Sequence, residues 1–136
     1  MADVIEVTAA IIQRKGRVLI CRRPAEKRCG LLWEFPGGKV ESGETGEECI
    51  RRECWEELGV ELEAPRLFTD VTHSYPGYTV HIRFYTAELA AGEPKRREHA
   101  ALCWAAPEEL SKYEFCPADA EMLAANRLTD VFYEGR

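Results

Sequence analysis

The segment from Gly38 to Val60 restricts the fold of this chain more than any other part of the sequence. It leads from a glycine pair through a loop into a stretch that carries Glu53, Glu56 and Glu57. Each residue of an α-helix turns by roughly 100°, so these three carboxylates fall on one face of a single helix. The fold must therefore hold an acidic helix face next to a glycine-containing loop.

The ends of this helix are marked in the sequence. Thr45-Gly46-Glu47-Glu48 has the form of a capping box, in which the Thr and Glu side chains each bind a backbone N–H of the first turn. Gly59 is placed to end the helix in a left-handed conformation. The sequence thus predicts a helix over about 46–58. The adjoining face carries an apolar stripe that would pack on a sheet, formed by Ile50, Cys54 and Leu58.

Two interpretations of the acidic face are available. It is either a solvated surface or a cation site, and like charges at such spacing cost roughly 0.2–0.5 kcal/mol per pair. The nearby Arg51 and Arg52 do not obviously cancel all three charges. We adopt the cation site, because carboxylate oxygens suit Mg²⁺ or Mn²⁺, and because Gly37 and Gly38 let the backbone approach a metal or phosphate closely. A bound Mg²⁺ would make an acidic cleft accept phosphates.

The rest of the sequence predicts one domain over residues 1–136, an α/β sandwich around a mixed sheet. Apolar runs at 4–12 and 17–21 flank a turn signal and predict a hairpin. Further strands are expected at 31–35 (stopped by Pro36-Gly37-Gly38), 60–63, 67–75, 79–85 and 101–105, with a helical turn at 107–110 and a second helix at 118–128.

Composition limits the partners. The chain has 18 basic and 24 acidic residues and a net charge of −6, which disfavours binding to a nucleic acid polymer or an anionic membrane. No signal peptide or long apolar span is visible, so we expect a cytoplasmic protein. The six cysteines contain no Cys-x-x-Cys pair and are expected to be reduced and mostly buried. The sequence does not indicate an oligomeric state.

Taken together, residues 38–60 resemble the complete motif of the Nudix hydrolases. The family pattern is Gly, five residues, Glu, seven residues, Arg-Glu, an aliphatic residue, any residue, Glu-Glu, any residue, Gly and an aliphatic residue. The matching residues are Gly38, Glu44, Arg52, Glu53, Glu56, Glu57, Gly59 and Val60. Only Cys54 departs, as a small apolar residue where Ile, Leu or Val is usual, and we expect little cost. Likeness to the MutT branch extends over 7–23, 33–39 and 115–119.

The resemblance implies a Nudix α/β/α sandwich with the motif as a loop–helix–loop. It also implies Mg²⁺, with Mn²⁺ as a substitute, and a free nucleotide as the substrate. We therefore expect a Mg²⁺-dependent pyrophosphohydrolase that converts nucleoside triphosphates to monophosphate and pyrophosphate and removes oxidised nucleotides such as 8-oxo-dGTP. The resemblance assigns metal ligation to the Gly37 carbonyl, Glu53, Glu56, Glu57 and Glu98. Arg52 would orient a carboxylate, Glu44 would support the loop, and either Glu53 or Glu98 would take the proton from water. For Glu98 the alternative is a solvated loop charge.

Other functions remain open at this point. One alternative is a hydrolase of CTP or 5-methyl-dCTP, or of another derivative such as ADP-ribose. Pro76, sixteen residues beyond the motif, is common in relatives that cleave ADP-ribose, although it also fits a hairpin turn. A third alternative is a non-catalytic nucleotide-binding module, but such a module should have lost a motif carboxylate.

The candidate nucleotide contacts are Arg23, Lys39, Phe35, Tyr75, Tyr78 and Asp119. The two cations would bind phosphates or else lie at the surface, and the aromatic rings would stack on the base or else belong to the core. Asp119 lies where relatives of the MutT branch read the base. An ionised Asp would accept from guanine N1 and N2 or from cytosine N4. Alternatively, it is an acidic residue favoured by the dipole of its helix.

Overall fold

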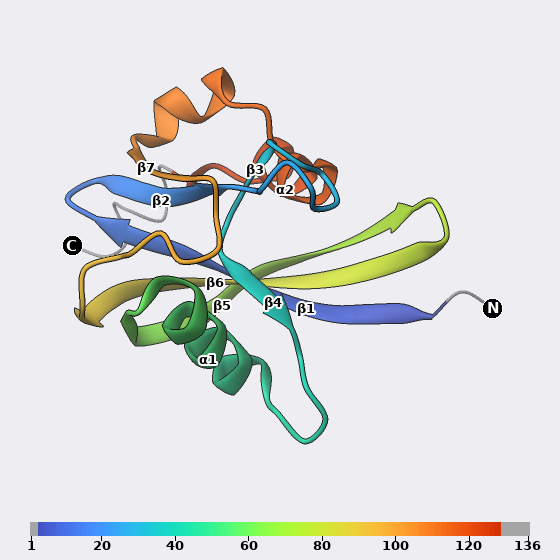
Figure 1. Ribbon diagram of the computed structural model, residues 1–136, viewed down its shortest axis with the longest axis horizontal. Coiled ribbons are helices and arrows are strands. Elements are labelled where there is room, and N and C mark those ends of the chain that lie inside the picture. Colours follow the sequence, from blue (N-terminus) through green and yellow to red (C-terminus); the bar gives the residue numbers. More distant parts are fainter. Residues whose placement is uncertain (1–2, 129–136) are drawn as a thin grey trace.

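The computed structural model describes residues 3–128 of the chain. Within that range a mixed sheet is covered by helices on both sides (Figure 1), which confirms the expected α/β/α sandwich. Its strands are β1 (Val4–Arg14), β2 (Arg17–Arg22), β3 (Trp33–Glu34), β4 (Gly37–Lys39), β5 (Glu61–Tyr75), β6 (Tyr78–Ala91) and β7 (Ala101–Ala105). The helices are α1 (Gly46–Leu58), the 3-10 helix η1 (Pro107–Lys112) and α2 (Pro117–Ala125).

Strand β1 is the centre of the sheet. The strand order is β3-β2-β1-β6-β5, with β4 paired to β1 and β7 paired to β2. β1 runs parallel to β6 and antiparallel to β2 and β4. Its early residues therefore contact β4, which leads into α1, while its last residues continue into the β2 side of the sheet. β1 therefore joins β2, β3 and β7 on one side of the sheet to β4, β5 and β6 on the other.

Each face of the sheet carries its own apolar core. On the α1 face, the predicted stripe of Ile50, Cys54 and Leu58 is fully buried against residues of β1, β2, β5 and β6. On the opposite face, Met122 of α2 and Leu110 of η1 pack over the sheet. Figure 1 shows α1 on one side of the sheet and η1 with α2 on the other.

Several predicted elements are confirmed. α1 spans the predicted range, and β7 has the predicted bounds. Tyr75 pairs with Tyr78 across the expected turn. Gly77 of that turn has a φ of 88°, which Pro-Gly turns of type II require. Pro76 therefore has a structural role in the hairpin.

Other boundaries were wrong. The separate segments 60–63 and 67–75 are one long strand, β5, because register shifts against β6 absorb the irregular residues between them. The strand expected at 31–35 is only β3, since Leu31 has a left-handed φ of 64°. The predicted stop is confirmed, because β3 ends at Glu34 before Pro36; a separate strand, β4, then begins at Gly37 and pairs with β1. The helix expected at 118–128 is α2, which ends at Ala125.

All six cysteines are free, as expected from the sequence. Four of them are buried, whereas Cys29 and Cys103 are partly exposed. In residues 3–128, none of the helices has the length and apolar character that a membrane crossing needs.

Candidate active site

The helix that carries the acidic face is fixed at both ends. Thr45 Oγ1 accepts a hydrogen bond from the Glu48 N–H at 3.1 Å, and Glu48 Oε1 accepts from the Thr45 N–H at 2.8 Å. At the other end, Gly59 has a left-handed φ of 71° and its N–H donates to the Trp55 carbonyl. A side chain at this position would be disfavoured. These local contacts set where α1 begins and ends.

Arg52 connects the loop to the acidic face. It donates to both oxygens of Glu44, at 2.6 Å from Nε and 3.0 Å from Nη2. It also donates to Glu53 Oε1 at 2.9 Å and to Glu56 Oε1 at 3.2 Å. The hydrogen bonds from Arg52, followed by that from the Glu41 backbone, lower the pKa of Glu44 to about 2. Arg52 therefore compensates two of the three glutamates of the face.

Glu57 is the member of the face that Arg52 does not reach. Its Oε1 is buried and has no hydrogen-bond partner within residues 3–128. Burial, followed by the charges of Glu53, Glu34 and Glu98, raises the pKa of Glu57 to about 9. An unpaired buried carboxylate is costly, and a divalent cation would relieve that cost. The donor set at Glu57 therefore fits a hard cation.

The other predicted ligands differ in their position relative to Glu57 and in their exposure. A side chain at Gly38 would overlap the Glu53 carboxylate, so β4 lies directly against it. Glu98, in the loop before β7, is near enough to contribute to the raised pKa of Glu57, while the Gly37 backbone acts in the opposite direction. Glu56 points outward, with its side chain 52% exposed.

No three His, Cys, Asp or Glu side chains in the described range, 3–128, are already arranged to hold a metal ion. The Arg52 guanidinium donates to both Glu53 and Glu56 in this structure. The predicted ligand set of Gly37, Glu53, Glu56, Glu57 and Glu98 therefore remains a prediction.

Two residues that were not predicted as site residues, Glu34 and His99, lie beside Glu57. His99 Nε2 donates to Glu34 Oε2 at 3.1 Å and lies 3.9 Å from Glu57 Oε1. Arg23 Nη1 donates to the other oxygen of Glu34 at 2.8 Å. In the sequence, His99 is next to Glu98, and Glu34 lies in the 33–39 segment that resembles the MutT branch.

An open cavity of about 480 Å³ lies next to this group, between β1, β6 and the loop after β2. Arg23, Lys39, Tyr75, Tyr78 and Asp119 all line it, as do Lys27, Arg28, Cys29 and Glu34. Five of the six candidate nucleotide contacts are thus brought together in one place.

Phe35 is the exception. Its side chain is 2% exposed and stacks on Phe115, with ring centroids 5.8 Å apart. It also meets Phe84 edge to face. The expectation that Phe35 stacks on a base is wrong, because the ring belongs to the core.

The two tyrosines form one wall of the cavity. Their rings stack at 5.1 Å with an interplanar angle of 12°. The Arg28 guanidinium covers the Tyr78 ring at 3.9 Å, and Tyr75 Oη accepts from the Ala118 N–H at 3.1 Å. A base that stacks on Tyr78 would therefore take the place of Arg28.

Asp119 lies in the first turn of α2 and is only 5% exposed. Its Oδ1 accepts from the Phe35 N–H at 3.4 Å. Burial, followed by the charge of Glu34, raises the pKa of Asp119 well above its usual range. Burial thus favours the acid form, which has both an O–H donor and a carbonyl acceptor, over the ionised, acceptor-only carboxylate expected from the sequence.

Comparison with known proteins gives consistent matches. A family model described as a NUDIX domain matches residues 7–125. The chain is 39% identical over 121 residues to the CTP pyrophosphohydrolase of Escherichia coli K12, covering 89% of this chain and 90% of the relative. It is 31% identical over 121 residues to the 8-oxo-dGTP diphosphatase of the same organism, covering 88% and 94%.

A similar solved structure is the crystal structure of a MutT NUDIX hydrolase from Burkholderia pseudomallei. It superimposes with a TM-score of 0.81 at 31% identity and covers 90% of this chain and 97% of that one.

Proposed function

The chain belongs to the Nudix family of hydrolases, which act on phosphoric anhydride bonds, and on this premise we propose that it is a Mg²⁺-dependent nucleoside triphosphate pyrophosphohydrolase. The reaction would convert a (deoxy)nucleoside triphosphate and water to the monophosphate and pyrophosphate. Nudix hydrolases generally use a divalent metal. Mg²⁺ is the ion we propose, with Mn²⁺ as a substitute, because the candidate ligands are all oxygens.

The observation that carries this proposal is the buried Glu57 Oε1, which has no hydrogen-bond partner among residues 3–128 and lies beside Glu53 and Glu98. With Glu56 and the Gly37 carbonyl, these residues would hold the metal. When bound, the metal would supply positive charge that stabilises the phosphoryl oxygens and the leaving pyrophosphate. Arg52 would keep Glu53 and the Glu44 loop in position through its hydrogen bonds.

The proton of the attacking water needs an acceptor within this group. Glu53 and Glu98 are the two candidates for that general base. Glu53 is held by Arg52, whereas Glu98 lies in an exposed position of the loop before β7. Arg23 and Lys39, which line the cavity, would contact the phosphates.

For the base, we propose 8-oxo-dGTP as the substrate and a cytidine triphosphate as the second candidate. The acid form of Asp119 supports both. Its O–H and carbonyl match cytosine N3 and N4, and they equally match guanine O6 and N1. Similarity to the CTP pyrophosphohydrolase favours the cytidine candidate, and similarity to the 8-oxo-dGTP diphosphatase favours the guanine candidate.

A substrate panel tests the proposal. We would measure kcat/KM with Mg²⁺ for 8-oxo-dGTP, dGTP, CTP, 5-methyl-dCTP and ADP-ribose, and identify the products. We expect monophosphate and pyrophosphate from the triphosphates, and no turnover after chelation with EDTA. A preference for ADP-ribose would replace the proposed substrate class, and full turnover in EDTA would refute the role of the acidic face.

A further inference from the structure

Four side chains form a continuous line from the cavity to α1. Arg23 Nη1 donates to Glu34 Oε1, and Glu34 Oε2 accepts from His99 Nε2. The same nitrogen of His99 lies 3.9 Å from Glu57 Oε1. Arg23 and Glu34 line the cavity, and Glu57 belongs to the acidic face. His99 therefore joins the two parts of the site, although the proposed chemistry assigns it no role.

His99 is placed where two carboxylates approach each other out of water. Its side chain is 4% exposed, and those of Glu34 and Glu57 are 18% and 13% exposed. Two buried carboxylates repel each other unless a donor lies between them. The Nε2–H of His99 donates to Glu34 and lies between the two groups, 3.9 Å from Glu57 Oε1.

The imidazole ring is held on this side only. Its Nδ1 is buried and has no hydrogen-bond partner in the part of the chain that the structure describes. The orientation of the ring is therefore set by the hydrogen bond to Glu34 and by the backbone that carries it.

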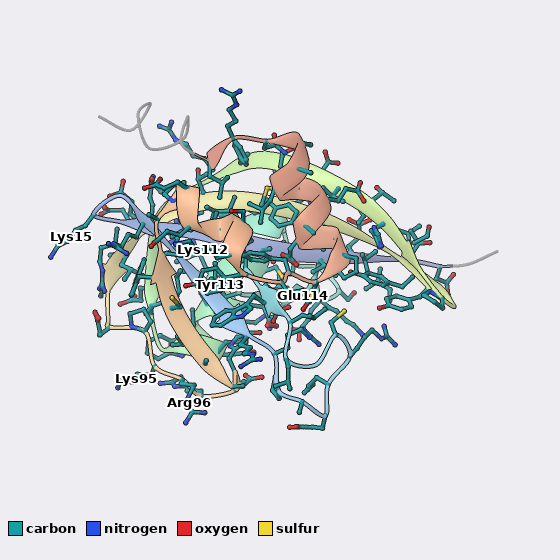
Figure 2. All side chains as sticks on the ribbon, turned by 90° about the horizontal axis from the view of Figure 1, so that it is seen from above. Lys15, Lys95, Arg96, Lys112, Tyr113 and Glu114 are labelled. Carbon is teal, nitrogen blue, oxygen red and sulfur yellow. The ribbon has the colours of Figure 1, made fainter. Side chains whose placement is uncertain are left out.

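That backbone is anchored both to β2 and to α1. The Ala100 N–H donates to the Arg22 carbonyl of β2 at 2.8 Å, and Arg97 Nη1 donates to the Trp55 carbonyl of α1 at 3.0 Å. Figure 2 shows Lys95 and Arg96 of the same loop at the outer edge of the molecule, whereas His99 is buried. Because the loop is fixed at two points, the backbone keeps His99 beside Glu57, with Nε2 at 3.9 Å from Glu57 Oε1.

We propose that His99 is a positioning residue that holds the Glu57 carboxylate ready for the divalent cation. This inference rests on the proposed function, in which Glu57 is a metal ligand. His99 is not itself a ligand here, because its Nε2–H donates to Glu34 Oε2. Residues that orient metal ligands typically contribute about 10–100-fold to metal affinity or activity.

Direct Mn²⁺ binding to the nucleotide-free protein tests the inference. We would measure it by electron paramagnetic resonance of free Mn²⁺ for the wild type, His99→Leu and His99→Gln. Leu fills the buried volume without a donor, so its Mn²⁺ dissociation constant should rise about tenfold. Gln keeps an N–H donor at similar reach and should restore most of that affinity. A merely structural histidine would not give this difference.

His81→Gln is the matched control. His81 also lies between two carboxylates, at 2.7 Å from Glu6 Oε1 and 2.7 Å from Asp70 Oδ2, but it does not line the cavity. Its variant should bind Mn²⁺ like the wild type. In steady-state assays, His99→Leu should raise the Mn²⁺ concentration for half-maximal rate while leaving the nucleotide KM at saturating Mn²⁺ nearly unchanged.

Three outcomes would overturn this inference alone. Wild-type Mn²⁺ affinity in His99→Leu would do so, as would a loss in His99→Gln equal to that in His99→Leu. If His99→Leu does not fold, His99→Asn replaces it, and its shorter amide should bind Mn²⁺ more weakly than Gln; equal affinity of these two would count against the inference. A wild type that binds no Mn²⁺ would instead refute the proposed function together with this inference.

Discussion

The carboxyl of Asp119 shows how burial changes what one residue can recognise. In the acid form it can donate to cytosine N3 and accept from N4. Once ionised, it can still accept from guanine N1 and N2, but with cytosine one of its oxygens faces the lone pair of N3. The charge on Asp119 therefore affects cytosine recognition more than guanine recognition.

The first prediction concerns this residue. As pH rises through the raised pKa of Asp119, the ratio of kcat/KM for CTP to that for 8-oxo-dGTP should fall. A bidentate contact contributes about 1–3 kcal/mol, so a change of roughly tenfold is expected. Asp119→Asn keeps a donor beside an acceptor at every pH, so its ratio should not change. Taking the ratio cancels pH effects on the shared metal site, and a constant wild-type ratio would contradict the role in base recognition.

Glu53 gives a second prediction at this scale. Glu53→Gln should reduce pyrophosphate release by at least about a hundredfold, because the amide can neither take a proton nor bring a charge to the metal. Its carbonyl can still accept from Arg52, so the thermal midpoint should stay close to that of the wild type. Glu98→Gln is the comparison. A variant that has lost only metal affinity should regain its rate when the metal concentration is raised. The general base is the residue, Glu53 or Glu98, whose variant stays slow under that condition. Undiminished turnover in Glu53→Gln would refute its assignment to the site.

Among the elements, α1 depends on contacts within its own segment. The Thr45 hydroxyl binds an N–H that no helical carbonyl can reach, so Thr45→Ala should lower the free energy of unfolding by about 1 kcal/mol. Thr45→Ser retains the hydroxyl and serves as the control. Urea unfolding of the three proteins measures the difference. Equal stability of the alanine variant and the wild type would show that the cap contributes little.

This local character explains why α1 could be predicted from the sequence. Its cap, its terminal Gly59 and its apolar stripe all lie within one short segment, and Glu53 and Glu57 share a face through helical spacing alone. By contrast, β5 is continuous only because register shifts against β6 allow it. Glu34 and His99 are 65 positions apart. They meet because β3 and β7 each pair with β2, which no local spacing reveals.

At the scale of the whole molecule, metal binding and stability should be linked. An ion that binds only the folded chain adds about 2.7 kcal/mol at 100 times its dissociation constant. For a chain of 136 residues, this corresponds to a rise of roughly 10 °C in thermal midpoint. Comparing wild-type melting in EDTA with melting in excess Mg²⁺ or Mn²⁺ measures this effect.

Glu57→Gln separates metal binding from the other sources of stability. In EDTA the variant should melt at or above the wild-type temperature, because it removes a carboxyl group whose buried oxygen has no partner in the described structure. In excess metal it should melt below the wild type, because a neutral amide is a poor ligand for Mg²⁺. The order of the two midpoints should thus reverse when metal is added. If the metal-induced shift is as large in Glu57→Gln as in the wild type, the cation binds elsewhere and the acidic face of α1 is only a surface.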